Sequence, residues 1–212
     1  MKQRHSDYMQ WAKLQSKARF NLATSGVAAF PLSELPCAID QLEINGDSTY
    51  GYAPLLQAIA KKAGVDPDCV VATAGTSMAN HLAMAALIEP GDEVLIEQPA
   101  YELLVSTAQY LQARVKRFPR FESDGYTLNP AEIRNAITCK TKLIVLTNLH
   151  NPTSVLAPES TLREVGDIAR SIDAHVLVDE VYLDAVYENT PASSFSASIL
   201  HEWHSAVLAS PA

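Results

Sequence analysis

The sequence lacks any apolar run of the roughly 18 to 20 residues that a membrane-spanning helix requires, and its first residues, Met1 to Trp11, are polar and charged. Its composition, 48% hydrophobic and 19% charged residues, is that of a globular protein, so disorder is not expected. With 212 residues the chain can bury a sizeable core as one large or two small domains. The sequence therefore predicts a soluble, cytoplasmic protein with no membrane partner.

Cysteine and positive charge are also scarce. Cys37, Cys69 and Cys139 are an odd number, widely spaced and without a CxxC pair, which argues against a disulfide framework or a zinc site. The formal net charge of −8 disfavours a nucleic acid as partner, since phosphate binding needs clustered Lys and Arg. The basic pair Lys61 and Lys62 is too short to change this.

Signature motifs of several other classes of site are missing. The sequence contains no GxxxxGK[ST], GxGxxG or GxSxG motif and no paired Cys-His arrangement, so nucleotide binding and hydrolysis are disfavoured. His201 and His204 flank Glu202, but they are three residues apart, whereas a helical zinc pair needs four. No metal site is expected.

From residue 53 onward, short β-branched runs alternate with helical stretches, a pattern typical of a parallel sheet with crossover helices on its faces. The expected strands are Cys69 to Thr73, Glu93 to Glu97, Arg114 to Phe118, Lys142 to Thr147 and His175 to Asp179. The expected helices are Pro54 to Ala63, Ser77 to Leu87, Tyr101 to Ala113, Pro130 to Ala136 and Pro158 to Ser171. The first fifty residues read differently, with one helix expected from Met9 to Phe20 and a loop-rich stretch from Asn21 to Gly51.

Polar residues gather in the loops after the expected strands, which is where ligands bind in open parallel sheets. Thr76 and Ser77 follow Gly75 at a strand-to-helix turn, where free backbone N–H groups could hold a phosphate, although Ser77 could equally be a plain N-cap. Asp179 ends an apolar strand, where a buried charge favours a cationic partner. That partner could be a protonated pyridine nitrogen or an arginine, or Asp179 could simply cap a turn.

Two further loops are ambiguous when each is taken alone. Asn151, Pro152 and Thr153 form a polar turn after an apolar strand, which could be only a loop. Tyr101 could be a core residue at a helix start, since aromatic residues more often serve packing than cofactor binding.

Four segments occur together and in order: TAGTSMA at 73 to 79, GDEVLIEQPAY at 91 to 101, NLHNPTS at 148 to 154 and VLVDEVY at 176 to 182. Together they resemble the class I and II aminotransferases of the aspartate aminotransferase fold type, over roughly residues 20 to 210. The resemblance implies an α/β three-layer sandwich with a mostly parallel central sheet. Residues 1–50 would be an N-terminal arm and part of a smaller domain, and residues 51–212 an incomplete, cofactor-binding large domain.

The resemblance also implies pyridoxal 5'-phosphate as cofactor and a role for each matching residue. Thr76 and Ser77 would bind its phosphate, and Tyr101 would stack on its pyridine ring. Asn151 would hydrogen-bond the phenolic oxygen.

Two residues would contribute to the chemistry itself. Asp179 would keep the pyridine nitrogen protonated, which makes the ring an electron sink. Tyr182 would help Asn151 at the phenolic oxygen and tune the acidity of the cofactor's imine.

Three further positions resemble the family less closely. Gly26 lies in a stretch like the loop that meets the substrate carboxylate. Tyr50 could reach the phosphate of a neighbouring subunit in a homodimer, or be a turn tyrosine in the core. Ser210 follows a strand-like run, Ala206 to Ala209, that resembles the approach to the family motif S-x-[ST]-K, and would be a phosphate ligand.

Two departures from the family pattern stand out. Ser154 replaces the more usual glycine of NPTG, which leaves Asn151 intact. The Schiff-base lysine follows the DEVY segment in the family, but the last lysine here is Lys142. We therefore expect a chain cut before that lysine and before the arginine that holds the substrate carboxylate, and hence inactive by itself.

The expected activity of the intact protein is transfer of an amino group from an amino acid to a 2-oxo acid, within amino acid metabolism or biosynthesis. A lyase or decarboxylase on the same fold is the alternative, because fold and cofactor do not settle the reaction type. A non-catalytic homologue that keeps the fold for binding or assembly is another.

Overall fold

The structure is a computed structural model that describes residues 6–15, 17, 19–20, 30–36, 39–41, 43, 46, 50–186 and 206–209. The chain divides into two compact units, Met1–Tyr52 and Ala53–Ala212, and each is described by itself. None of the helices within the described ranges is both long and apolar enough to cross a membrane.

The first unit contains α1 (Asp7–Leu14) and two short 3-10 helices, η1 (Leu32–Glu34) and η2 (Ile39–Gln41). The α1 helix begins at Asp7 because the Ser6 side chain accepts a hydrogen bond from Met9 N and so caps the first turn. It ends at Leu14, so the expected helix from Met9 to Phe20 was placed too late and made too long. The assignment of residues 1–50 to an N-terminal arm and part of a smaller domain stays a prediction.

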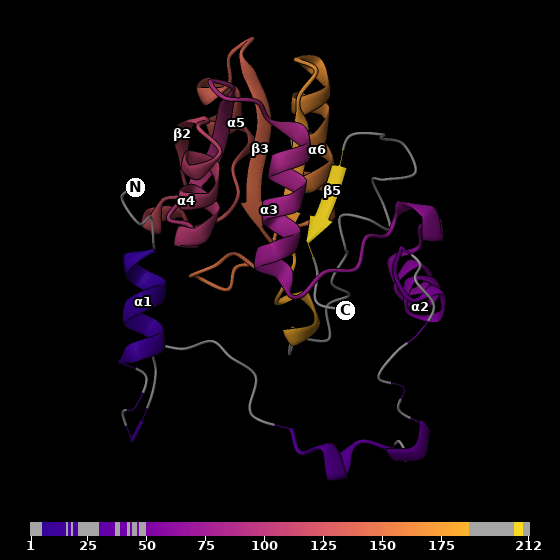
Figure 1. The fold of residues 1–212 in the computed structure, drawn as a ribbon. Helices are drawn as coiled ribbons and strands as arrows, with labels where there is room; N and C mark the ends of the chain where they lie inside the picture. Colours follow the sequence, from indigo (N-terminus) through magenta and orange to yellow (C-terminus); the bar gives the residue numbers. More distant parts are fainter. Residues whose placement is uncertain are drawn as a thin grey trace. The chain divides into compact units, whose positions relative to one another are not determined.

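The second unit is built on a sheet of five strands in the order β2-β1-β3-β4-β5, with every neighbouring pair parallel. The strands are β1 (Glu93–Gln98), β2 (Arg114–Pro119), β3 (Thr141–Thr147), β4 (His175–Asp179) and β5 (Ala206–Ala209). The strand expected at Ala206 to Ala209 is present, as are the four expected between residues 93 and 179. The predicted α/β sandwich with a mostly parallel sheet is confirmed (Figure 1).

In the described part of this unit, five α-helices accompany the sheet: α2 (Ala53–Ala63), α3 (Thr76–Leu87), α4 (Glu102–Tyr110), α5 (Pro130–Ala136) and α6 (Glu159–Ser171). The described part of this unit also contains three 3-10 helices: η3 (Pro67–Cys69), η4 (Glu122–Asp124) and, after β4, η5 (Leu183–Ala185). The α4 helix ends at Tyr110 instead of the expected Ala113. Gln112 adopts a left-handed φ of 65° and Ala113 N bonds to Ala108 O, which closes the helix with a Schellman motif.

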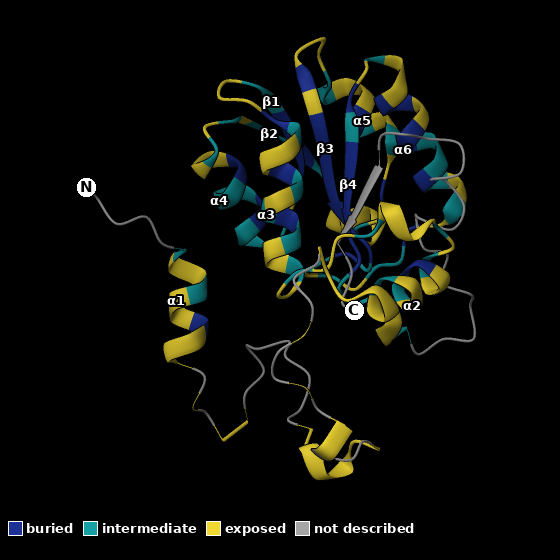
Figure 2. Cartoon of the chain, turned by 45° about the vertical axis from the view of Figure 1, so that its right-hand side comes forward, coloured by how far each residue is buried: buried dark blue, intermediate teal, exposed yellow. Residues whose placement is uncertain are grey.

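Alternate residues of the strands face two separate cores, one on each side of the sheet. Leu143, Val145 and Leu177 pack against Met84 of α3 and Leu104 of α4. The opposite core is lined by the following strand and helix residues: Ile144, Leu146, Val176, Ile133 of α5 and Leu162 of α6. Strands covered on both faces must be apolar on both, and Figure 2 shows β3 and β4 buried while the outer sides of the helices are exposed.

The strand expected from Cys69 to Thr73 was wrong. Pro67 and the Asp66 side chain, which accepts from Asp68 N, favour the η3 turn over Pro67–Cys69. After this turn, residues 70–73 pair with no strand in the described part of the chain, and Val71 is 78% exposed. A β-branched run forms a strand only where a neighbouring strand supplies backbone hydrogen-bond partners. The composition of residues 69–73 alone therefore did not predict their structure.

We expect Leu177→Ala to lower the free energy of unfolding by about 2 to 5 kcal/mol, because it empties a buried site between β4 and α3. Urea denaturation followed by circular dichroism measures the change. The control is Gln109→Ala on the exposed side of α4, which should change stability by less than about 0.5 kcal/mol. A similar small change for both variants would contradict the buried position of Leu177.

Candidate functional site

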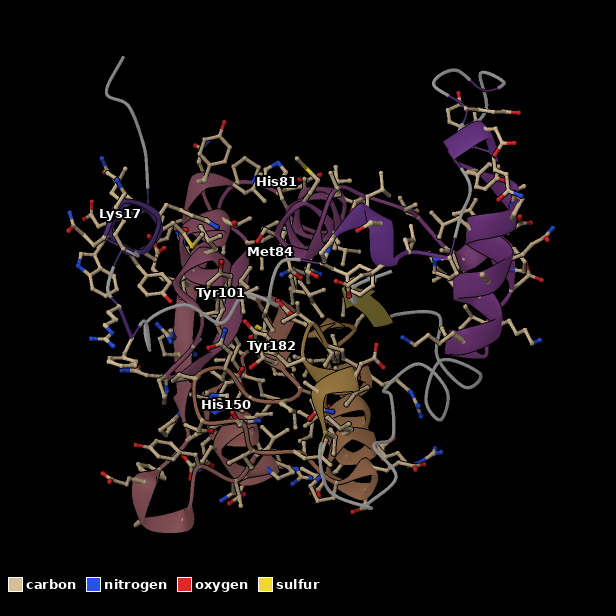
Figure 3. The ribbon with its side chains drawn as sticks, turned by 90° about the horizontal axis from the view of Figure 1, so that it is seen from below. Lys17, His81, Met84, Tyr101, His150 and Tyr182 are labelled. Carbon is tan, nitrogen blue, oxygen red and sulfur yellow. The ribbon has the colours of Figure 1, made fainter. Side chains whose placement is uncertain are left out.

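The carboxyl ends of β1, β3 and β4 lie at one edge of the sheet, because the strands are parallel and neighbours. This edge is the lower one in Figure 1, and Figure 3 views the chain from below. Tyr101 follows β1, His150 follows β3 and Tyr182 follows β4, so the three labelled side chains come from three adjacent loops. Asn151 shares the loop of His150. The loops that the sequence singled out therefore do meet at one edge.

The first turn of α3 reaches the same edge. Asn80, one turn after Thr76, donates from Nδ2 to Oδ2 of Asp179 at 2.8 Å, and both residues are buried. The N-cap residue is Gly75, whose φ of 85° favours glycine and which has no side chain to accept from the first N–H groups of the helix. Thr76 and Ser77 thus lie at a helix N-terminus beside Asp179, in a position suited to an anion.

Asp179 is a buried carboxylate at the end of β4, with 3% of its surface exposed. Its Oδ1 accepts from Val181 N at 3.0 Å, and Oδ2 accepts from Asn80. Burial raises the pKa of Asp179, and these two hydrogen bonds oppose the rise. The turn-capping role considered from the sequence is therefore present. An ion pair with arginine is not found among the described residues, so no cation there balances the charge.

A second buried carboxylate, Glu97, lies near the end of β1, and sequence reasoning missed it. Its Oε1 accepts from Thr147 N at 2.6 Å and from Thr147 Oγ1 at 2.7 Å. Arg120 Nε lies 3.1 Å from the other oxygen, Oε2, as an ion pair without hydrogen-bond geometry. Burial raises the pKa of Glu97 to about 7, although Arg120 and Thr147 act in the opposite direction. The sequence did contain a signal for this residue, because Glu97 ends an expected apolar strand, as Asp179 does.

His150 connects the loops after β1 and β3. Its Nε2 lies 3.0 Å from Pro99 O and its Nδ1 lies 2.6 Å from Thr153 Oγ1. A carbonyl oxygen can only accept, so Nε2 carries the proton and Nδ1 accepts from the Thr153 hydroxyl. Burial, helped by the charge of Arg120, lowers the pKa of His150 to about 4. The ring is therefore neutral at pH 7.

The loop after β3 is also tied to its neighbours through its backbone. Asn151 N donates to Thr147 Oγ1 at 2.8 Å, and Asn148 N donates to Asp179 O at 2.8 Å. The Asn148 side chain accepts from Ala157 N at 3.0 Å. These hydrogen bonds attach the polar turn to the ends of β3 and β4.

The other candidate residues fall into three groups. Tyr101 and Tyr182 are partly buried, and Tyr101 packs against the core between the sheet, α3 and α4, as its alternative role implied. Tyr50 belongs to the first unit and is fully exposed, which excludes a core position within that unit. Gly26 and Ser210 lie outside the described residues.

Comparison with known proteins identifies the family. The model of the family "Aminotransferase class I and II" matches residues 34–209. The chain belongs to this family. The resemblance inferred from the four sequence segments is thereby confirmed.

Two curated relatives illustrate the similarity. A probable aspartate/prephenate aminotransferase of Thermus aquaticus is 29% identical over 144 residues, which are 65% of this chain and 38% of the relative. The arginine–pyruvate transaminase AruH of Pseudomonas aeruginosa is 27% identical over 201 residues, which are 89% of this chain and 51% of the relative. The chain therefore spans about half or less of the length of these relatives.

Solved structures agree with the fold. An alanine aminotransferase from Pyrococcus furiosus is 34% identical with a TM-score of 0.64, covering 70% of this chain and 39% of that one. An aromatic aminotransferase from Pyrococcus horikoshii OT3 is 25% identical with a TM-score of 0.70, covering 77% of this chain and 45% of that one.

The buried, neutral His150 predicts a pH dependence of stability. Its folded pKa lies below its unfolded pKa, so the unfolded state binds the proton first, and stability is lost as pH falls from about 6.5 towards 4. We expect wild type to lose stability relative to His150→Gln over this range, by up to roughly 1.4 kcal/mol per pH unit. Urea titrations of both proteins at pH 7, 5.5 and 4.5 measure the difference.

The control is Gln109→Ala on the exposed side of α4, which changes no titratable group. The difference between wild type and this control should change little with pH. An equally flat difference for His150→Gln would show that His150 is not held neutral by the fold.

Proposed function

We propose that the complete protein transfers an amino group between an amino acid and a 2-oxo acid, with pyridoxal 5'-phosphate as cofactor. The observation that carries the proposal is Asp179, a buried carboxylate beside the N-terminus of α3 that no described cation balances. A protonated pyridine nitrogen would supply the positive charge, and the helix N-terminus suits the phosphate. Membership of the aminotransferase family supports amino transfer over a lyase or decarboxylase reaction.

The chain has a polar group for each part of the cofactor. Six residues are the proposed ligands: Thr76, Ser77, Tyr101, Asn151, Asp179 and Tyr182. Thr76 and Ser77 would hold the phosphate with the first N–H groups of α3, and Tyr101 would stack on the ring. The Asn151 amide and the Tyr182 hydroxyl would donate to the phenolic oxygen. Three further roles stay predictions, namely Tyr50 and Ser210 as phosphate ligands and Gly26 at the substrate carboxylate.

Asp179 would have the central chemical task. When bound, the cofactor supplies a ring that accepts the electron pair released at the substrate α-carbon. The Asp179 carboxylate would keep a proton on the pyridine nitrogen, which that role requires. Asn80 and Val181 N hold the two carboxylate oxygens, so the side chain would need little reorganisation on binding.

The remaining requirement is a lysine after the DEVY segment, and the 212 residues contain none there. Lys142 is the last lysine of the sequence and lies near the amino end of β3. The five residue steps from Lys142 to Thr147 span about 17 Å along the strand, so Lys142 is at the wrong edge of the sheet. We therefore propose that the 212 residues alone bind the cofactor non-covalently and do not transfer amino groups.

A non-catalytic homologue that keeps the fold for binding or assembly stays the alternative prediction. A homodimer and a cytoplasmic location stay predictions. A form that carries the family lysine would decide between an enzyme and a binding protein.

We expect Asp179→Asn to weaken binding of pyridoxal phosphate by roughly 10- to 100-fold, because it removes a charge-assisted hydrogen bond worth about 1.5 to 3 kcal/mol. Fluorescence titration of the 212-residue chain with the cofactor measures the dissociation constant. The matched control is Asp184→Asn, which alters an exposed aspartate five residues further on. Equal affinities for both variants would remove Asp179 from the site.

We expect no amino transfer from the 212-residue chain in an assay that couples 2-oxo acid formation to NADH oxidation. Borohydride treatment in the presence of cofactor should leave no stoichiometric adduct on a single lysine, because the 212 residues lack the lysine that follows the DEVY segment in the family. A form extended through the family lysine should gain both properties. Amino transfer by the 212 residues alone would refute the proposal.

A further inference from the structure

The buried ion pair of Glu97 and Arg120 has no part in the proposed cofactor chemistry, yet it adjoins the loops that carry the proposed ligands. Both side chains are fully buried, with Nε and Oε2 3.1 Å apart. The other carboxylate oxygen, Oε1, accepts from both the backbone N and the hydroxyl of Thr147, the last residue of β3. The carboxylate thus fixes the direction in which the Thr147 hydroxyl proton points.

This orientation determines what the Thr147 oxygen can do next. Since Oγ1 donates its proton to Glu97, its lone pairs are left to accept, and Asn151 N donates to it at 2.8 Å. A chain of contacts therefore runs from Arg120 through Glu97 and Thr147 to the backbone of Asn151. The buried His150 ring adds a second tie, from Pro99 O in the loop of Tyr101 to Thr153 in the loop of Asn151.

We propose that Glu97 is a positioning residue of this site: by orienting the Thr147 hydroxyl it fixes the backbone of Asn151, and with it the amide that would contact the cofactor. The inference rests on the proposed function for the role of Asn151. Glu97 touches neither cofactor nor substrate in this account, and acts only through Thr147.

The opposite edge of the sheet offers a matched comparison on the same two strands. Glu93 begins β1 and Thr141 begins β3, and Thr141 Oγ1 donates to Glu93 Oε1 at 2.6 Å. The same hydroxyl accepts from Thr138 N at 2.9 Å. Thr141 is 1% exposed and Thr147 is 2% exposed. Each threonine hydroxyl therefore donates to a glutamate and accepts from a backbone N–H at nearly the same burial. The backbone N–H groups differ, since that of Thr147 donates to Glu97 and that of Thr141 donates to Thr138 O. Only Thr147 adjoins the proposed cofactor ligands.

The experiment compares Thr147→Val with Thr141→Val in the 212-residue chain. Each substitution keeps the side-chain shape and leaves one backbone N–H without its acceptor, so both should shift the urea midpoint downward by similar amounts. Hydrogen exchange should accelerate at least roughly tenfold at Asn151 N in the first variant and at Thr138 N in the second. Binding of pyridoxal phosphate, measured by fluorescence well below either midpoint, should weaken roughly tenfold in Thr147→Val alone.

Two more variants separate positioning from general destabilisation. Thr147→Ser keeps the hydroxyl and should restore both cofactor affinity and slow exchange at Asn151. The pair Glu97→Leu with Arg120→Met removes the ion pair without leaving a buried charge, and should speed Asn151 exchange and weaken binding while Thr147 is intact.

The results can overturn the proposal in distinct ways. Wild-type affinity in Thr147→Val, or equal losses of affinity in Thr147→Val and Thr141→Val, would show that the Glu97 contacts serve only stability. If wild type itself does not bind the cofactor, the proposed function fails. The claim that Glu97 positions the backbone of Asn151 through Thr147 is then tested by hydrogen exchange at Asn151 N. An unchanged exchange rate in Glu97→Leu with Arg120→Met would refute it.

Discussion

Glu97 and Asp179 are among the carboxylates buried at the carboxyl edge of the parallel sheet, and the arrangement of this edge follows from their need for hydrogen-bond donors. Taking an ionised carboxylate out of water costs several kcal/mol, whereas one hydrogen bond to a charged group contributes about 1.5 to 3 kcal/mol. Each carboxylate therefore needs more than one partner. Glu97 obtains its donors from Thr147 and its counter-charge from Arg120, and Asp179 obtains its donors from Asn80 and Val181 N.

These partners come from different elements, so satisfying the carboxylates also assembles the edge. Glu97 joins the end of β1 to the end of β3, and Asp179 joins the end of β4 to the first turns of α3. The negative charge of Asp179 further raises the pKa of Glu97. A positive charge beside Asp179 would relieve this repulsion. The same edge that is costly to bury is thus suited to a cationic ligand group.

The sheet behind this edge supplies the rigid support. Its central strands are apolar on both faces, and α3 and α4 cover one face while α5 and α6 cover the other. The helices leave the carboxyl edge to the loops, which is where ligands bind in folds of this kind. His150 and Thr147 then connect these loops to the sheet and to one another. The backbone positions of the ligand-bearing loops therefore depend on buried contacts with the ends of the strands.

The sequence by itself determined the element order, the parallel sheet and the family. Each buried strand must be apolar on both faces, and each ligand-bearing loop keeps a recognisable pattern such as HNPT or DEVY. It placed Asp179 correctly at the end of a strand, but it also predicted a strand at Cys69 to Thr73 that has no described neighbour. Only the tertiary structure decided that Asn80 meets Asp179, 99 residues away, and that Glu97 meets Thr147, 50 residues away. Such pairs depend on which strands become neighbours and how α3 lies on the sheet, and local sequence patterns do not carry that information.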